Sequence, residues 1–148
     1  MPTVLRSLAL PTMAALLAIA GCSTAPANLD LSLDKATSKG SYRVTLVPPA
    51  ETVAINKMHS WQVKVATTVG QPVTDATIGV DGGMPQHLHG LPTKPRVTRE
   101  LAPGVYLVEG MKFSMPGWWE IKFDVRASLG SDNVTFNAVL DDSGARKQ

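Results

Sequence analysis

The sequence predicts an all-β protein, an antiparallel sandwich of about seven or eight short strands, and three observations predict it. From Ser41 onward, apolar and polar residues alternate with a period of two, in short runs rich in β-branched and aromatic side chains. Turn-forming residues separate these runs, in a chain of 148 residues with 12 Gly and 11 Pro. No stretch of ten or more residues holds a helical stripe well. The length allows one domain, and roughly 100 residues suffice for one core without disulfides.

Each predicted strand ends at a recognisable turn signal. The first ends at Pro48-Pro49 and the third at Asp81-Gly82-Gly83. The fourth is expected at a sheet edge, and residues 111–115 continue the fifth or return from it. In the sixth, Trp119 lies on the apolar face and Trp118 on the opposite face, so we expect Trp119 in the core. The predicted strands are residues 42–47, 61–66, 76–80, 96–101, 104–110, 118–126 and 133–140.

The first 22 residues form a targeting signal. Arg6 is the only charged residue before Asp30, and an apolar run follows it that is too short to span a bilayer and ends in small residues. The end of this run, Ile19-Ala20-Gly21-Cys22, resembles the bacterial lipobox, a signal in which the cysteine is lipidated and the chain is cut just before it. We therefore expect a lipoprotein anchored through Cys22. Ser23 favours sorting to the outer membrane in a cell with two membranes.

The chain divides into four parts on this basis. We expect a signal peptide over 1–21, a lipidated cysteine and flexible tether over 22–40, a β-sandwich domain over 41–140 and a disordered tail over 141–148. Within the tether, Leu29, Leu31 and Leu33 alternate with polar residues, which is typical of a short strand or a partly ordered stalk. The domain is expected to work in the cell envelope, outside the cytoplasm.

Composition and missing motifs exclude several classes of function. The net charge is only +2 and no block of Lys or Arg occurs, so nucleic-acid binding is not expected. Cys22 is the only cysteine, which rules out an intrachain disulfide, a Cys-based zinc knuckle and an iron–sulfur cluster. No G-x-S-x-G, H-E-x-x-H or Gly-rich phosphate motif is present, and we do not expect an enzyme. A zinc hydrolase with His59, His87 and His89 as ligands stays open as a lesser alternative.

Every histidine and methionine after Cys22 falls into one of three short groups. They are Met58-His59, Met84-Pro85-Gln86-His87-Leu88-His89-Gly90 and Met111-Lys112-Phe113-Ser114-Met115. Imidazole and thioether ligands without thiolate suit copper better than zinc or a hard cation.

Spacing decides which members of these groups can bind one ion. In an extended segment His87 and His89 point to the same face, about 7 Å apart along the strand. Met84 has the opposite parity and joins them only if Pro85 turns the chain. Met111 and Met115 share a face but lie about 13 Å apart on a straight strand, so one of them is core or the segment is a loop.

Two stretches resemble a known family. Residues 80–92, with Met-Pro-x-His-x-His-Gly, and residues 104–121, with Phe-x-Met-x-Gly-x-Trp, are similar to the YtkA-like and FixH-like families of small extracytoplasmic bacterial domains. The resemblance implies an immunoglobulin-like sandwich and a link to copper handling for cytochrome oxidase assembly. FixH-like proteins usually carry a membrane helix, whereas this chain carries a predicted lipid anchor. The motif residues here are Met84, His87, His89, Met111 and Met115.

These observations favour a lipid-anchored, extracytoplasmic copper-binding module that sequesters or delivers copper. Its expected ligands are His87, His89 and Met84, with one of Met111 or Met115. Its expected partners are the membrane, through Cys22, and a copper donor or acceptor protein. A blue-copper electron carrier is disfavoured because such a site needs a Cys thiolate. The alternative is an envelope interaction module without metal, in which residues 82–95 and Trp118 contact a protein or glycan.

Overall fold

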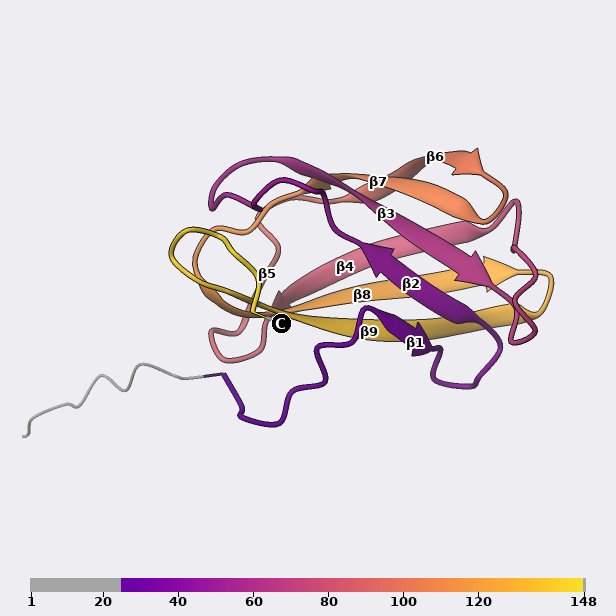
Figure 1. Cartoon of the computed structure of the whole chain (residues 1–148), viewed down its shortest axis with the longest axis horizontal. Helices are drawn as coiled ribbons and strands as arrows, with labels where there is room; N and C mark the ends of the chain where they lie inside the picture. The colour runs from indigo at the N-terminus through magenta and orange to yellow at the C-terminus, as the bar shows by residue number, and fades with distance from the viewer. Residues whose placement is uncertain (1–24, 148) are drawn as a thin grey trace, which may run out of the picture.

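The computed structural model describes residues 25–147, which form nine strands and no helix (Figure 1). No helix in this part of the chain is therefore long and apolar enough to cross a membrane. The signal peptide, the lipidated Cys22 and the sorting residue Ser23 lie outside the described residues. The strands are β1 (Asp34–Ala36), β2 (Arg43–Val47), β3 (His59–Ala66), β4 (Thr77–Met84), β5 (His89–Gly90), β6 (Arg96–Ala102), β7 (Val105–Met111), β8 (Gly117–Ala127) and β9 (Gly130–Leu140).

The strands form two antiparallel sheets that pack face to face, as the sequence predicts (Figure 1). One sheet has the order β1-β2-β3-β7-β6 and the other β5-β4-β8-β9. An immunoglobulin sandwich pairs its first, second, fifth and fourth strands in one sheet and its third, sixth and seventh in the other. Strands β2, β3, β7 and β6 and strands β4, β8 and β9 reproduce this order, with β5 added beside β4 and β1 beside β2. The fold is an immunoglobulin-like β-sandwich.

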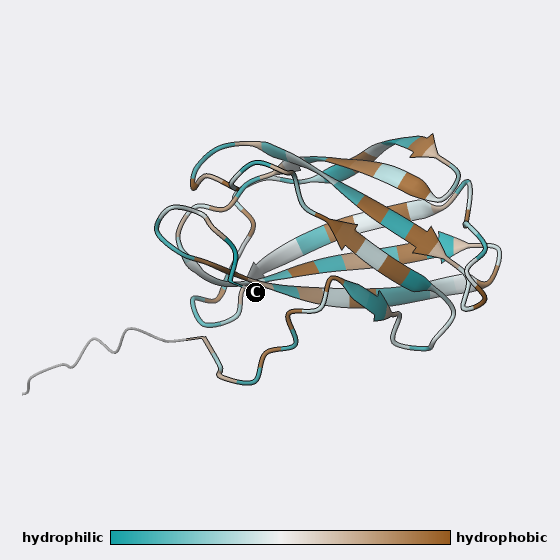
Figure 2. Ribbon diagram, in the orientation of Figure 1, coloured by the Kyte–Doolittle hydropathy of each residue, from teal (hydrophilic) through white to brown (hydrophobic). Residues whose placement is uncertain are grey.

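Alternation along the strands produces the core. Figure 2 shows hydrophobic and hydrophilic residues in alternating bands along the strands. The predicted inward face of β3 is buried at Trp61, Val63 and Val65, and Trp119 on β8 is fully buried. Strand β6 is an edge strand, also as predicted.

Strand β4 is longer than the sequence predicts. The Asp81-Gly82-Gly83 segment was expected to end the strand, but β4 runs through it to Met84. The reason is steric, because a Cβ atom at Gly82 would collide with the backbone oxygen of Glu120 on β8. These glycines permit a close approach between backbones and do not form a turn.

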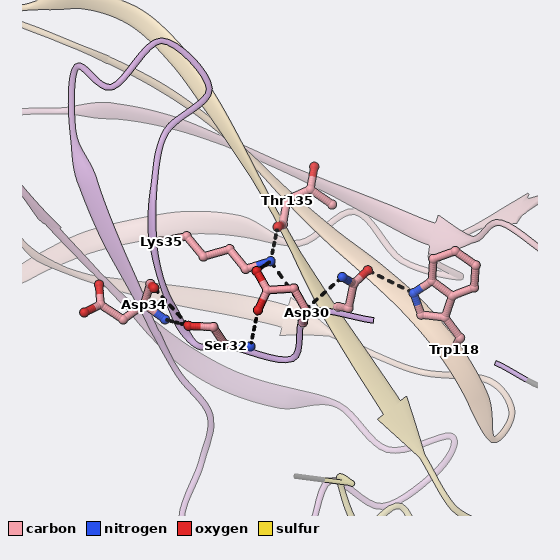
Figure 3. Close-up of polar contacts among 7 residues, drawn as sticks. Asp30, Ser32, Asp34, Lys35, Trp118 and Thr135 are labelled. Carbon is pink, nitrogen blue, oxygen red and sulfur yellow. Dashed lines mark hydrogen bonds and ion pairs between the residues drawn. The ribbon is translucent and has the colours of Figure 1, made fainter. Parts of the chain in front are cut away.

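The segment over residues 29–40 is ordered, whereas a flexible tether was expected, with a short strand or partly ordered stalk at Leu29, Leu31 and Leu33. It contains β1, and its side chains fasten it to the other sheet (Figure 3). The Lys35 ammonium pairs with the Asp30 carboxylate at 2.9 Å and donates to the Thr135 carbonyl on β9 at 3.2 Å. The Asn137 amide donates to the Asp30 carbonyl at 2.9 Å and accepts from the Trp118 indole N–H at 3.0 Å. The segment thus covers the β9 edge, which would otherwise be open to pairing.

The predicted disordered tail is also ordered over residues 141–147. The chain turns back after β9, with Asp141 N–H donating to the Ala145 carbonyl and Lys147 N–H donating to the Val139 carbonyl. Gly144 is buried and has a positive φ of 82°. Polar composition predicted disorder here, but the Asp141 carboxylate organises the turn by accepting from the N–H groups of Ser143 and Ala145.

The surroundings of Asp132 on β9 indicate that the protein loses stability in acid. Burial raises the pKa of this carboxyl, but the nearby Thr37 hydroxyl and hydrogen bonds from the backbone N–H groups of Ser41, Asn133 and Lys39 outweigh burial and hold the pKa far below its usual range. A depressed pKa in the folded state stabilises the protein above the unfolded-state pKa of about 3.9 and stops doing so as the pH falls through the folded-state value.

We therefore expect the thermal midpoint to fall as the pH drops below about 4. Asp132→Asn is expected to have a lower midpoint at pH 7 and a smaller fall on acidification. Thermal melts followed by circular dichroism between pH 2 and pH 7 test this, with the exposed Asp124→Asn on β8 as the control. Equal acid slopes for the wild type and Asp132→Asn would contradict it.

Candidate metal centre

Strand pairing brings the three histidine and methionine groups to one end of the sandwich. His59 begins β3 and pairs with Met111, which ends β7. Met84 ends β4, whose neighbouring residue Gly83 pairs with Glu120 near the start of β8. Residues 112–116 cross from β7 to β8 at this same end, where β5 also lies (Figure 1).

A tight hairpin connects Met84 to His89. Residues 85–88 form the turn, with the His87 N–H donating to the Met84 carbonyl at 3.0 Å. Pro85 suits the first corner of such a turn because its φ is already fixed near the required value. Leu88 takes a left-handed φ of 54° and returns the chain, so that His89 pairs with Met84 across the hairpin. The segment is a turn rather than extended, and the condition set for Met84, a turn at Pro85, is met.

The two imidazoles of this hairpin lie close together at the surface. The ring centroids of His87 and His89 are 6.0 Å apart, with an interplanar angle of 32°, and both residues are exposed. A metal–nitrogen bond of about 2.0 Å allows the centroids of two ligating imidazoles to be roughly 5–6 Å apart. The pair therefore fits bridging by one ion.

One hydrogen bond selects the tautomer of His89. Its Nδ1 atom lies 3.0 Å from the carbonyl oxygen of Gly90, which can only accept. In the neutral imidazole Nδ1 therefore carries the proton, and Nε2 has the lone pair that a metal would bind. A backbone carbonyl on the second ring nitrogen is the usual way in which proteins orient a histidine ligand.

The Trp119 side chain packs against the hairpin at His89. Its ring meets the His89 ring in an edge contact with centroids 5.6 Å apart, and it contacts Phe113 at 5.2 Å. Its indole N–H donates to the Met115 carbonyl at 3.1 Å, which fastens the loop over residues 112–116 to β8. Sequence reasoning placed Trp119 in the core and missed this support. No local sequence signal reveals this contact, because it depends on the pairing of β4 with β8.

The predicted methionine ligands have different environments. Met84 is buried beside Gly117 on β8 and is the cross-strand partner of His89. Met111 is 1% exposed and belongs to the core, as one of the predicted alternatives had it, whereas Met115 is 36% exposed in the loop. Within residues 25–147, no hydrogen bond or ring contact joins Met111 or Met115 to the histidine pair. The structure therefore brings the imidazoles of His87 and His89 together, while Met84, 1% exposed like Met111, lies in the core opposite His89 across the hairpin.

The remaining histidine is held elsewhere. His59 is half-buried, and its Nε2 atom lies 2.9 Å from the Ala54 carbonyl, to which it donates. Among the described residues, no three His, Cys, Asp or Glu side chains gather as they would around a metal ion. The three-histidine zinc alternative therefore has no support in the geometry.

A shallow hollow of about 410 Å³ lies against the hairpin and gives access to it. Met84, His89 and Glu120 line it, and the glycines at positions 82 and 83 keep it open because they carry no side chains. Glu120 also pairs with Lys122 at 3.0 Å.

Comparison with known proteins identifies one family. The model of the family described as YtkA-like matches residues 37–124, a range that includes all five predicted ligands. No curated protein sequence matches this chain. The Lin-41 filamin domain is similar in structure at 14% identity and a TM-score of 0.43, covering 72% of this chain and 96% of that one. The ZirS C-terminal domain is similar at 13% identity and a TM-score of 0.40, covering 93% of this chain and 86% of that one.

Proposed function

The chain belongs to the YtkA-like family, and we propose that it is a lipid-anchored copper-binding module that sequesters or delivers copper. The family and the immunoglobulin-like fold fit an envelope domain. The observation that carries the copper proposal is the hairpin that brings the imidazoles of His87 and His89 together and pairs His89 with Met84 across its two strands. The anchor at Cys22 and the outer-membrane location are parts of the same proposal.

The donor set suits copper as a cargo. Imidazole nitrogens accept both oxidation states of copper, and a thioether favours Cu(I). The Gly90 carbonyl and the Trp119 ring orient His89 before the ion arrives. Met115, half-exposed in the loop fastened to Trp119, is the candidate for a fourth donor. With only three donors gathered in the hairpin, the ion stays open to exchange with a donor or acceptor protein.

A copper titration tests the proposal. Residues 25–147 contain both sheets and the core, so a soluble form that begins at Ser23 includes the complete folded unit. We expect one-to-one binding of Cu(I) and Cu(II) with a Kd below about 1 µM, measured against a competing chelator. His87→Ala/His89→Ala is expected to weaken binding at least about 100-fold, because two of the three donors are lost.

Two further variants test which side chains bind the copper. Met84→Leu keeps the size of the side chain but removes the sulfur, so it should weaken Cu(I) about tenfold and leave Cu(II) nearly unchanged. His59→Ala is the matched control, because this histidine lies at the same end of the sandwich and is bonded to Ala54. Weak binding that the His87 and His89 substitutions do not change would overturn the copper proposal.

One observation favours the alternative function, a protein-interaction module without metal. Leu88 is 93% exposed and has a left-handed backbone, a costly arrangement for a large apolar residue. Backbone strain of this kind clusters at functional sites, and a contact with a partner would bury the Leu88 side chain. If this reading is right, His87→Ala/His89→Ala leaves the metal content of the purified protein unchanged, and Leu88→Ser weakens capture of the partner from membranes.

A further inference from the structure

A second cavity lies apart from the histidine hairpin, where both ends of the described chain meet the loop after β2. This cavity, the terminal groove, has a volume of about 640 Å³, within the roughly 300–1,000 Å³ range of small-molecule sites. Three segments distant in sequence line it, residues 31–33, 48–53 and 144–146. Its apolar lining side chains are Leu31, Leu33, Pro48, Pro49, Ala50, Val53 and Ala145.

One cation lines this apolar groove without a partner. The Nε atom of Arg146 is buried and has no hydrogen-bond partner within residues 25–147, and no ion pair there includes Arg146. Burial lowers the pKa of the guanidinium, which nevertheless stays charged in proteins. A buried donor left unpaired costs stability. Because Arg146 also lines the groove, an anion bound there would give the unpaired guanidinium a charged partner.

The backbone around Arg146 is held in place before any ligand arrives. Arg146 forms a β-bridge with Leu140, the last residue of β9. Gly144 packs so closely on Val53 that a Cβ atom at this position would collide with the Val53 backbone. The C-terminal turn is therefore docked on the loop after β2, and the guanidinium is presented from a fixed backbone.

We propose that the terminal groove binds a long-chain carboxylate, an amphiphile whose head group pairs with Arg146 and whose alkyl chain lies along the apolar walls. A planar guanidinium matches a carboxylate through two parallel hydrogen bonds. The head group carries a single charge, because the groove offers one guanidinium and also contains the carboxylate of Glu51, which would repel a more highly charged phosphate. The alkyl chain follows from the seven apolar side chains that line the groove.

Isothermal titration of the soluble form that begins at Ser23 with dodecanoate, below its micelle concentration, tests the proposal. We expect one-to-one binding, and we expect Arg146→Gln to weaken it at least about tenfold. Dodecan-1-ol has the same alkyl chain without the charge, so its weaker binding should be the same in wild type and Arg146→Gln. Arg99→Gln, an exposed arginine on the β6 edge, is the matched control and should change neither.

Two other outcomes would overturn the proposal. No dodecanoate binding by a folded wild-type protein overturns the proposal. Equal binding of dodecanoate and dodecan-1-ol, unaffected by Arg146→Gln, also overturns it, because the groove would then be an apolar surface without head-group recognition. A thermal melt of each variant confirms that it is folded. Arg146→Gln should leave the copper affinity unchanged. A negative result in this titration would therefore not count against the copper proposal, and the reverse also holds.

Discussion

Replacing Trp119 with alanine is expected to lower the free energy of unfolding by about 3–5 kcal/mol, the range for truncation of a fully buried tryptophan. Trp119 is 0% exposed, and its ring lies between Phe113 in the core and His89 at the surface. The substitution leaves a cavity beneath the hairpin and frees the Met115 carbonyl that the indole N–H now satisfies. Thermal and urea unfolding measure the loss, which corresponds to a fall in Tm of roughly 10–25 °C for a domain of this size.

The neighbouring residue provides the matched control. Trp118 is half-buried on the outer face, where its indole donates to Asn137, so Trp118→Ala should cost only about 1–2 kcal/mol. Trp119→Phe keeps a ring against His89 and Phe113 and should recover most of the stability lost in the alanine variant. If the two alanine variants were equally stable, Trp119 would not be the support of the hairpin.

Gly82→Ala is expected to destabilise the protein by about 3 kcal/mol, although it adds only one methyl group. That methyl would collide with the backbone oxygen of Glu120 on the paired strand and would lie 3.2 Å from the Cδ1 atom of Leu91. A backbone atom cannot give way as a flexible side chain can, so β4 must shift. Because the Gly82 carbonyl accepts the N–H of Leu91, the shift also moves the strand that follows His89.

Gly79→Ala on the same strand is the control for glycine removal. Its new methyl would lie 3.5 Å from the Cβ atom of Asp124, an ordinary contact on the exposed face. We expect a change within about 1 kcal/mol, in the stabilising direction, because alanine restricts the unfolded chain. Urea unfolding of both variants gives the comparison, and similar values would contradict the steric argument at Gly82.

Strand position was largely predictable from the sequence, because period-two alternation is a local property of the chain. Trp119 and the inward face of β3 were placed in the core on this basis, and β6 was placed at a sheet edge. The local signals failed at Asp81-Gly82-Gly83, where turn-forming residues continue a strand because they allow β8 to approach. They also failed at residues 141–147, which look flexible when taken alone but are held by Asp141 within its own turn. At residues 29–40 they failed in part, since a flexible tether was expected there together with a short strand or partly ordered stalk, and Lys35 fastens the segment to β9.

The candidate site was partly predictable for the same reason. The choice of His87, His89 and Met84 came from a short motif, and the turn at Pro85 that joins them is local too. Met111 could not be separated from Met115 by spacing, because burial against the opposite sheet decides between them, and the structure buries Met111.

The sequence by itself determined the all-β class, the alternation that builds the core, and the grouping of histidine and methionine in three short segments. Only the tertiary structure decided that these segments share one end of the sandwich, because pairing of β3 with β7 and of β4 with β8 joins residues far apart in the chain. It alone revealed the terminal groove, whose walls come from residues 31–33, 48–53 and 144–146. No local pattern encodes contacts between such distant segments, since they depend on how the two sheets close over a shared core.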